Sequence, residues 1–307
     1  MFQPTLLATK RKQILRHWQL YLLILLPIVW LIIFCYVPMY GVQLAFKKFS
    51  YSKGIFDSPW VGLRYFELFF TSPSGWLVIS NTLYLSFYSL VAGFPLPIIL
   101  AIALNETRNR SVKKTVQMIT YAPYFISTVV LVGMMFQVLD PRLGVINKII
   151  EVFGGTPISF MGESTLFASV YVWSGIWQHI GYSAVVYLAA LAAVSPELQE
   201  AARIDGCTRF QRIWHVDLPG IAPTIITLLI LNFSHIMGIG FEKIFLMQNP
   251  MNSQASEVIS TYVYKVGLVN GNFGFSTAIG LFNSLVNVIL LVTANKIARR
   301  YSDSGLW

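Results

Sequence analysis

Residues 195–219 read SPELQEAARIDGCTRFQRIWHVDLP and separate two long apolar runs of the chain. Ser195 suits an N-cap, Pro196 suits the first helical position, and the Glu197 carboxylate lies at the positive end of the helix dipole. Gly206 supplies a stop signal. The stretch therefore predicts a helix of about ten residues, which is too short to be stable alone in water. We expect another surface to hold it.

The composition on either side of this stretch is typical of a membrane protein. Of the 307 residues, 55% are hydrophobic and only 11% are charged, whereas about a quarter of a soluble domain is charged. A bilayer core needs roughly 20 apolar residues per helix. We predict an all-α integral membrane protein with six transmembrane helices. The six runs lie near residues 19–39, 79–104, 116–139, 166–190, 221–241 and 276–297.

The chain shows no low-complexity linker that would separate soluble domains. We therefore predict one membrane domain over residues 1–307, with a core of roughly 79–297 and the polar loop at 191–220. The outer loop at 40–78 is rich in aromatic residues, prolines and glycines, which favours a folded cap with short helical pieces.

The distribution of cations predicts the orientation. Fourteen of the 22 Lys and Arg residues flank the runs on the side of the N-terminus, the 191–220 loop and the C-terminus, and eight lie on the other side. Because cytoplasmic loops carry the excess of Lys and Arg, we expect both termini in the cytoplasm. The net charge of +9 is spread over short loops, so it indicates lipid headgroups rather than a nucleic-acid partner.

The polar loop also carries a pattern at fixed spacing. Glu200-Ala201-Ala202, three residues, Gly206, nine residues, Val216, one residue and Leu218-Pro219 resemble the cytoplasmic signature of binding-protein-dependent ABC importer permeases, with Val216 at a position that is usually Ile. The resemblance implies the type I importer architecture and a coupling helix that docks on a cytoplasmic ATPase. The coupling residues that it implies are Glu200, Ala201, Ala202, Asp205, Gly206, Leu218 and Pro219.

Further stretches resemble the carbohydrate-uptake branch of these permeases, which transports complex oligosaccharides and includes maltose-type permeases. They are residues 60–63 (WVGL), 123–127, 187–192 and the closing Gly-Leu-Trp at 305–307. The resemblance implies a cell-membrane location and an oligosaccharide cargo. It also implies four kinds of partner: a second homologous permease, two ATPase subunits that hold ATP and magnesium, and an extracytoplasmic solute-binding protein.

Polar groups inside the runs are costly in lipid, so they mark either a pathway or interhelical packing. Several of them share helix faces at spacings of three or four residues. Aromatic rings, imidazoles and amides could bind sugar rings and hydroxyls in a wet cavity, whereas the alternative is hydrogen bonding between helices. Packing is favoured for Asn283 and Asn287. The candidate pathway residues are Trp177, His179, Tyr182, Asn232, His235, Asn283 and Asn287.

The chain has no phosphate-binding loop and no clustered metal-ligand motif. We therefore expect a translocation subunit with no catalytic residue, no metal and no cofactor of its own. Two alternatives remain open. One is an ABC permease for amino acids, peptides or phosphate, and the other is a passive or ion-coupled carrier.

Overall fold

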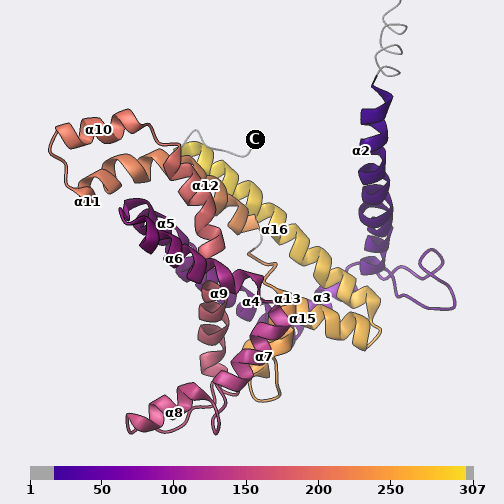
Figure 1. The fold of residues 1–307 in the computed structure, drawn as a ribbon. Coiled ribbons are helices and arrows are strands. Elements are labelled where there is room, and N and C mark those ends of the chain that lie inside the picture. The colour runs from indigo at the N-terminus through magenta and orange to yellow at the C-terminus, as the bar shows by residue number, and fades with distance from the viewer. Residues whose placement is uncertain (1–16, 235, 302–307) are drawn as a thin grey trace, which may run out of the picture.

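The computed structural model describes residues 17–234 and 236–301, in which the regular secondary structure is helical apart from two isolated β-bridges. Figure 1 shows the arrangement of the helices. Their order along the chain is α2 (Trp18–Leu31), η1 (Ile32–Tyr36), η2 (Val37–Phe46), α3 (Arg64–Thr71), α4 (Pro73–Gly93), α5 (Pro95–Glu106), α6 (Arg110–Tyr121), η3 (Ala122–Phe125), α7 (Thr128–Val138), α8 (Val145–Val152), α9 (Ser164–Ala192), α10 (Pro196–Ile204), α11 (Arg209–Arg212), η4 (Ile213–Asp217), α12 (Leu218–Ser234), α13 (Phe241–Met247), α14 (Ser253–Ser256), α15 (Ile259–Tyr264), η5 (Lys265–Val269) and α16 (Phe273–Tyr301).

Six helical segments are long and apolar enough to cross a membrane when each bent pair is taken as one span. Four are unbroken: Trp18–Phe46, Pro73–Glu106, Arg209–Phe233 and Phe273–Arg300. The fifth is α9 followed by α10, with a bend of 72°, and the sixth is Arg110–Phe125 followed by Thr128–Val138. Each predicted apolar run overlaps one of these segments, so the prediction of six membrane helices is confirmed.

The predicted run at 116–139 is not a straight helix. It bends by 102° between Phe125 and Thr128. Pro123 ends the first helix, and the Ser127 hydroxyl accepts a hydrogen bond from Val130 N as the N-cap of α7. Hydropathy averaged along the sequence does not detect this break, because the residues on both sides of the bend are apolar.

The fifth predicted run is displaced along the chain. Its helix begins at Arg209 and α12 ends at Ser234, instead of covering 221–241. Gly238 and Gly240 lie in the irregular segment before α13, consistent with the low helix propensity of glycine. The polar loop is therefore shorter than the predicted 191–220, because helical structure resumes at Arg209.

Helix α9 is central to the packing of the chain and contacts α4, α5, α6 and α12. Small residues permit the close approaches, because helices in lipid associate by packing rather than by exclusion of water. Ala101 on α5 and Ala184 on α9 are fully buried. At Gly181 an added Cβ would lie 2.2 Å from the carbonyl oxygen of Thr120, so α6 and α9 touch backbone to backbone.

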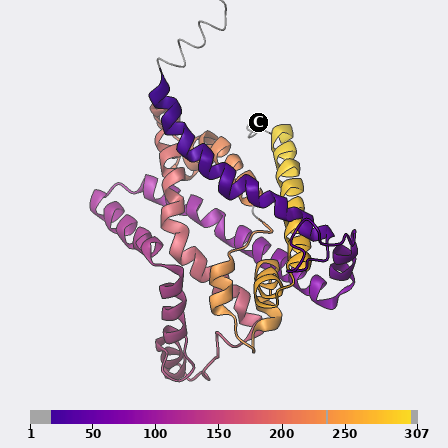
Figure 2. The same ribbon diagram turned by 90° about the vertical axis from the view of Figure 1, so that its right-hand side faces the viewer.

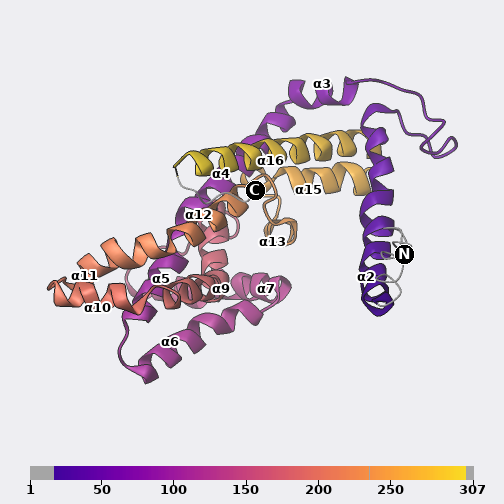
Figure 3. The same cartoon turned by 90° about the horizontal axis from the view of Figure 1, so that it is seen from above.

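Helix α2 stands apart from the other helices (Figures 1 and 3), and Figure 2 shows it inclined to α16. None of its residues is buried within the chain, so lipid or another chain covers this apolar helix. The outer loop that follows is folded, as predicted. It contains α3 and two isolated antiparallel bridges, Lys47 with Trp60 and Ser50 with Gly54.

Candidate functional site: a docking helix and a cavity

Helix α10 confirms the helix predicted at the polar loop. The Ser195 hydroxyl accepts a hydrogen bond from Glu197 N at 3.2 Å, and the helix runs from Pro196 to Ile204. Gly206 has a φ of +75°, which an L side chain rarely adopts. The chain then reverses into α11, so that α10 and α11 lie side by side at one end of the molecule (Figure 1).

The outer face of this helical hairpin presents both charged and apolar side chains. Glu200, Ala201, Asp205 and Gly206 are exposed. Large apolar side chains surround them, and Ile204 is 86% exposed. Exposed apolar groups clustered at a site outside the bundle indicate a surface that binds another protein. The other large apolar residues exposed here are Leu198 and Phe210.

The remaining predicted coupling residues lie elsewhere on the loop. Ala202 is buried against the chain, so Ala201 is the alanine that faces outward. Leu218 and Pro219 begin α12, where they continue the helix that rises from α11. They belong to the connection to the membrane span rather than to the exposed face of α10.

A polar network that the sequence analysis did not predict ties the hairpin to the membrane helices. Asp217 is buried, and its Oδ1 accepts a hydrogen bond from Gln199 Nε2 on α10. Arg212 forms an ion pair with Glu106 at the end of α5. Gln199 and Asp217 therefore join α10 to η4, which continues directly into α12. The spacing of Gln199 and Asp217, 18 residues apart, gives no signal in a sequence.

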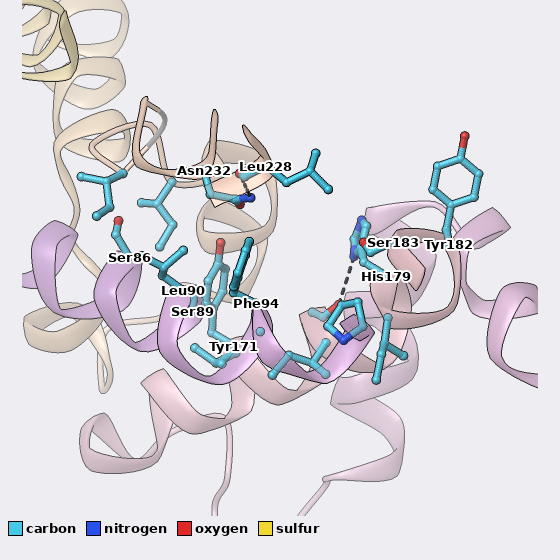
Figure 4. Close-up of a pocket in the computed structure, with 18 of the residues that line it drawn as sticks. Ser86, Ser89, Leu90, Phe94, Tyr171, His179, Tyr182, Ser183, Leu228 and Asn232 are labelled. Atoms are coloured by element: carbon cyan, nitrogen blue, oxygen red, sulfur yellow. Dashed lines mark hydrogen bonds between the residues drawn. The ribbon is translucent and has the colours of Figure 1, made fainter. Parts of the chain in front are cut away.

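The second part of the site is a cavity of about 570 Å³ between α4, α5, α9, α12 and α13. His179, Tyr182 and Asn232, three of the candidate pathway residues, line the same cavity. Figure 4 shows Tyr182 at one end of the group, His179 next to it and Asn232 farther along, with Tyr171 and Phe94 on the wall. Serine hydroxyls line it at Ser86, Ser89 and Ser183, and aliphatic side chains supply much of the rest of the lining.

Tyr182 and His179 also contact an aromatic residue from the bend after α6. The ring of Tyr124 stacks on the ring of Tyr182 at 3.9 Å between centroids and 8° between planes. The same ring meets His179 edge-on at 5.8 Å. Tyr182 nevertheless remains 51% exposed. His179 Nδ1 lies 3.0 Å from Gly175 O, and Asn232 Nδ2 donates to Leu228 O at 2.8 Å.

The other candidate pathway residues do not line this cavity. Trp177 is on α9 but outside the lining, and Asn283 lines a separate hollow between α15, η5 and α16. Asn287 Oδ1 accepts a hydrogen bond from Met237 N at 3.1 Å, the packing role favoured for it. His235 lies outside the described residues, as do Lys10, Arg11, Lys12, Arg16 and the closing 305–307 segment.

Comparison with known proteins decides the family. Residues 93–303 match the family described as binding-protein-dependent transport system inner membrane component. The chain belongs to this family. The resemblance noted from the signature is thereby confirmed, and the chain is a multi-pass membrane permease subunit.

Relatives of this permease align over almost the whole chain. The polygalacturonan/rhamnogalacturonan transport system permease protein YteP of Bacillus subtilis (strain 168) is 40% identical over 97% of this chain and 94% of its own length. Protein LplB of the same organism is 41% identical over 94% and 91%. A chain of a bacterial alginate ABC transporter, solved with a periplasmic protein that carries an alginate pentasaccharide, has a TM-score of 0.90 at 39% identity. That match covers 96% of this permease and 99% of the solved chain.

Proposed function

We propose that this chain is a translocation subunit of an ATP-driven importer that takes up oligosaccharides delivered by an extracytoplasmic binding protein. The observation that carries the proposal is the capped helix α10, which stands outside the bundle and is joined to α12 by Gln199 and Asp217. The relatives named for polygalacturonan and for alginate support the cargo class. The cavity, with aromatic rings, hydroxyls and amides, suits a polyhydroxylated ring.

The partners follow from this role. A second homologous permease would face the cavity, and two ATPases would receive the coupling helices and hold ATP and magnesium. ATP-driven closure of the ATPases would move α10, and the Asp217 connection would pass that movement to the wall of the cavity that carries Asn232. No bond of the sugar is broken.

Reconstitution tests the proposal directly. The purified complex in liposomes, supplied with the binding protein outside and ATP inside, should accumulate a labelled oligosaccharide and hydrolyse ATP faster when the sugar is present. Uptake that persists without ATP would favour the carrier alternative. Uptake of amino acids, peptides or phosphate in place of the sugar would favour the other permease classes.

We further propose that both ends of the chain lie in the cytoplasm. The start of α2 and the end of α16 lie at the same end of the molecule as α10, while α8 lies at the opposite end (Figure 1). A reporter inserted near Arg209 and one fused after Trp307 should both report the cytoplasm, and a reporter near Gly155 should report the outside. A reporter near Arg209 that reads outside would contradict docking on an ATPase.

A further inference from the structure

One lysine of the cavity wall has no role in the function proposed above. Lys243 lies on α13, lines the cavity and is only 9% exposed. Its Nζ donates a hydrogen bond to Tyr171 O at 2.9 Å and lies 4.9 Å from the centroid of the Tyr171 ring. Gly175 on α9 leaves room for it, because a Cβ there would lie 3.2 Å from Nζ.

Lys243 has no carboxylate partner in the part of the chain that the structure describes. The ion pairs found there join Arg212 to Glu106 and Lys265 to Glu257. An ammonium group has three N–H donors, and of these only the bond to Tyr171 O is made within residues 17–234 and 236–301. A buried cation without a counter-charge is strongly unfavourable, and in a membrane protein such a residue marks a functional site.

Lys47 is a buried lysine whose ammonium group finds more hydrogen-bond acceptors within the chain than that of Lys243. Its Nζ donates to two carbonyl oxygens, of Ile55 at 3.1 Å and of Phe56 at 2.9 Å, and lies over the Trp60 ring. It closes the folded outer loop and does not line the cavity. Lys243 has the same aromatic support but fewer acceptors, and it lines an open space that a ligand can enter.

Lys243 supplies the positive charge among the described residues that line the cavity. The described residues that line the cavity with it are aliphatic and aromatic side chains, serines, an asparagine and His179, with no Asp or Glu among them. A cleft walled by one sign of charge and low-dielectric groups concentrates ligands of the opposite sign. The free donors of an ammonium group bind carboxylate oxygens through charge-assisted hydrogen bonds.

We propose that Lys243 is a specificity-determining residue that selects oligosaccharides bearing carboxylate groups, that is, chains of uronic acid residues. The proposal rests on the oligosaccharide import function proposed above. The carboxylate would take the donors of Nζ that the chain leaves free, and the Tyr171 ring would remain on the other side of the ammonium group.

The test compares an acid with its neutral ester on the purified complex without the binding protein, so that the transmembrane cavity alone selects. Binding of trigalacturonate and of its trimethyl ester is measured by titration calorimetry. Wild type should bind the acid about tenfold more tightly than the ester. Lys243→Gln should abolish that preference, and Lys243→Arg should keep most of it. Lys148→Gln, which removes an exposed lysine of α8, is the matched control and should leave the preference unchanged.

Equal binding of acid and ester by wild type would overturn the proposal even if Lys243→Gln failed to assemble. A preference that persists in Lys243→Gln, or an equal loss of both ligands in that variant, would overturn it as well. Transport into proteoliposomes with binding protein and ATP distinguishes a failure of the Lys243 proposal from a failure of the proposed import function. If they accumulate oligosaccharide while the cavity shows no preference for the acid, only the inference about Lys243 is wrong. If they accumulate neither probe, the import function itself is contradicted.

Discussion

The helical hairpin of α10 and α11 and the cavity depend on different kinds of interaction. The hairpin is local: Ser195, Pro196 and Gly206 act within a few residues of one another, and each has the structure that its residue type favours. The cavity is assembled from α4, α5, α9, α12 and α13, so its residues come from positions 86 to 243. Local signals therefore explain the helix that the permease presents outside the bundle, whereas long-range packing explains the lining of the cavity.

One helical stretch runs from the hairpin to the cavity. The helix that begins at Arg209 carries Arg212 and Asp217 at the end near α10 and Asn232 near its other end. Gln199 of α10 bonds to this helix at Asp217, so one continuous helix connects the hairpin with the cavity wall. Substitutions in the hairpin should change coupling, and substitutions in the cavity should change affinity.

The largest effect is expected at Gly206. Its φ of +75° is strained for any L residue and most of all for a β-branched one. Gly206→Val should therefore abolish transport and sugar-stimulated ATP hydrolysis while the complex still assembles. Gly206→Asn is the matched control, since Asn tolerates this conformation better, and it should retain most of the coupling. Sugar-stimulated ATPase in proteoliposomes measures both variants, and full stimulation in Gly206→Val would show that the turn is not needed for docking.

A smaller effect is expected at the junction between the two regions. Arg212→Leu leaves the Glu106 carboxylate partly buried and without its cation, which should destabilise the complex by about 2 kcal/mol, less than for a fully buried pair. The melting temperature of the purified complex should fall by several degrees. Arg209→Leu removes an exposed neighbouring charge and serves as the control. If the two variants have the same melting temperature, the ion pair between Arg212 and Glu106 does not stabilise the junction.

The smallest effects are expected in the cavity. Tyr182→Ala and Asn232→Ala should each weaken sugar affinity by about 1 kcal/mol, roughly fivefold in the KM for uptake, because each removes one contact among several. Basal ATPase should not change. Asn287→Ala is the contrasting variant, since it removes the acceptor of Met237 N and should lower stability rather than affinity. If all three variants behave alike, the division between cavity and packing residues is wrong.

Several features could be predicted from the sequence because their causes are local or additive. Apolar runs near the length of a bilayer predicted six membrane helices, and the capping residues predicted α10. The spacing of polar residues within the apolar runs also marked His179 and Tyr182, which line one cavity. Helix ends were less accurate where irregular backbone interrupts an apolar run, as at Pro123 and Gly238, because hydropathy does not report backbone conformation.

What the sequence alone determined about this permease is its helical, membrane-spanning character and the helix that it presents outside the bundle, since both follow from interactions within a turn or from the average polarity of a run. Tertiary structure decided which faces meet: the stacking of Tyr124 on Tyr182, the bond between Gln199 and Asp217, and the placement of Lys243 against Tyr171 in a cavity. The partners in these contacts are between 18 and 72 residues apart. No local rule specifies such pairs, because each depends on how all the helices pack at once.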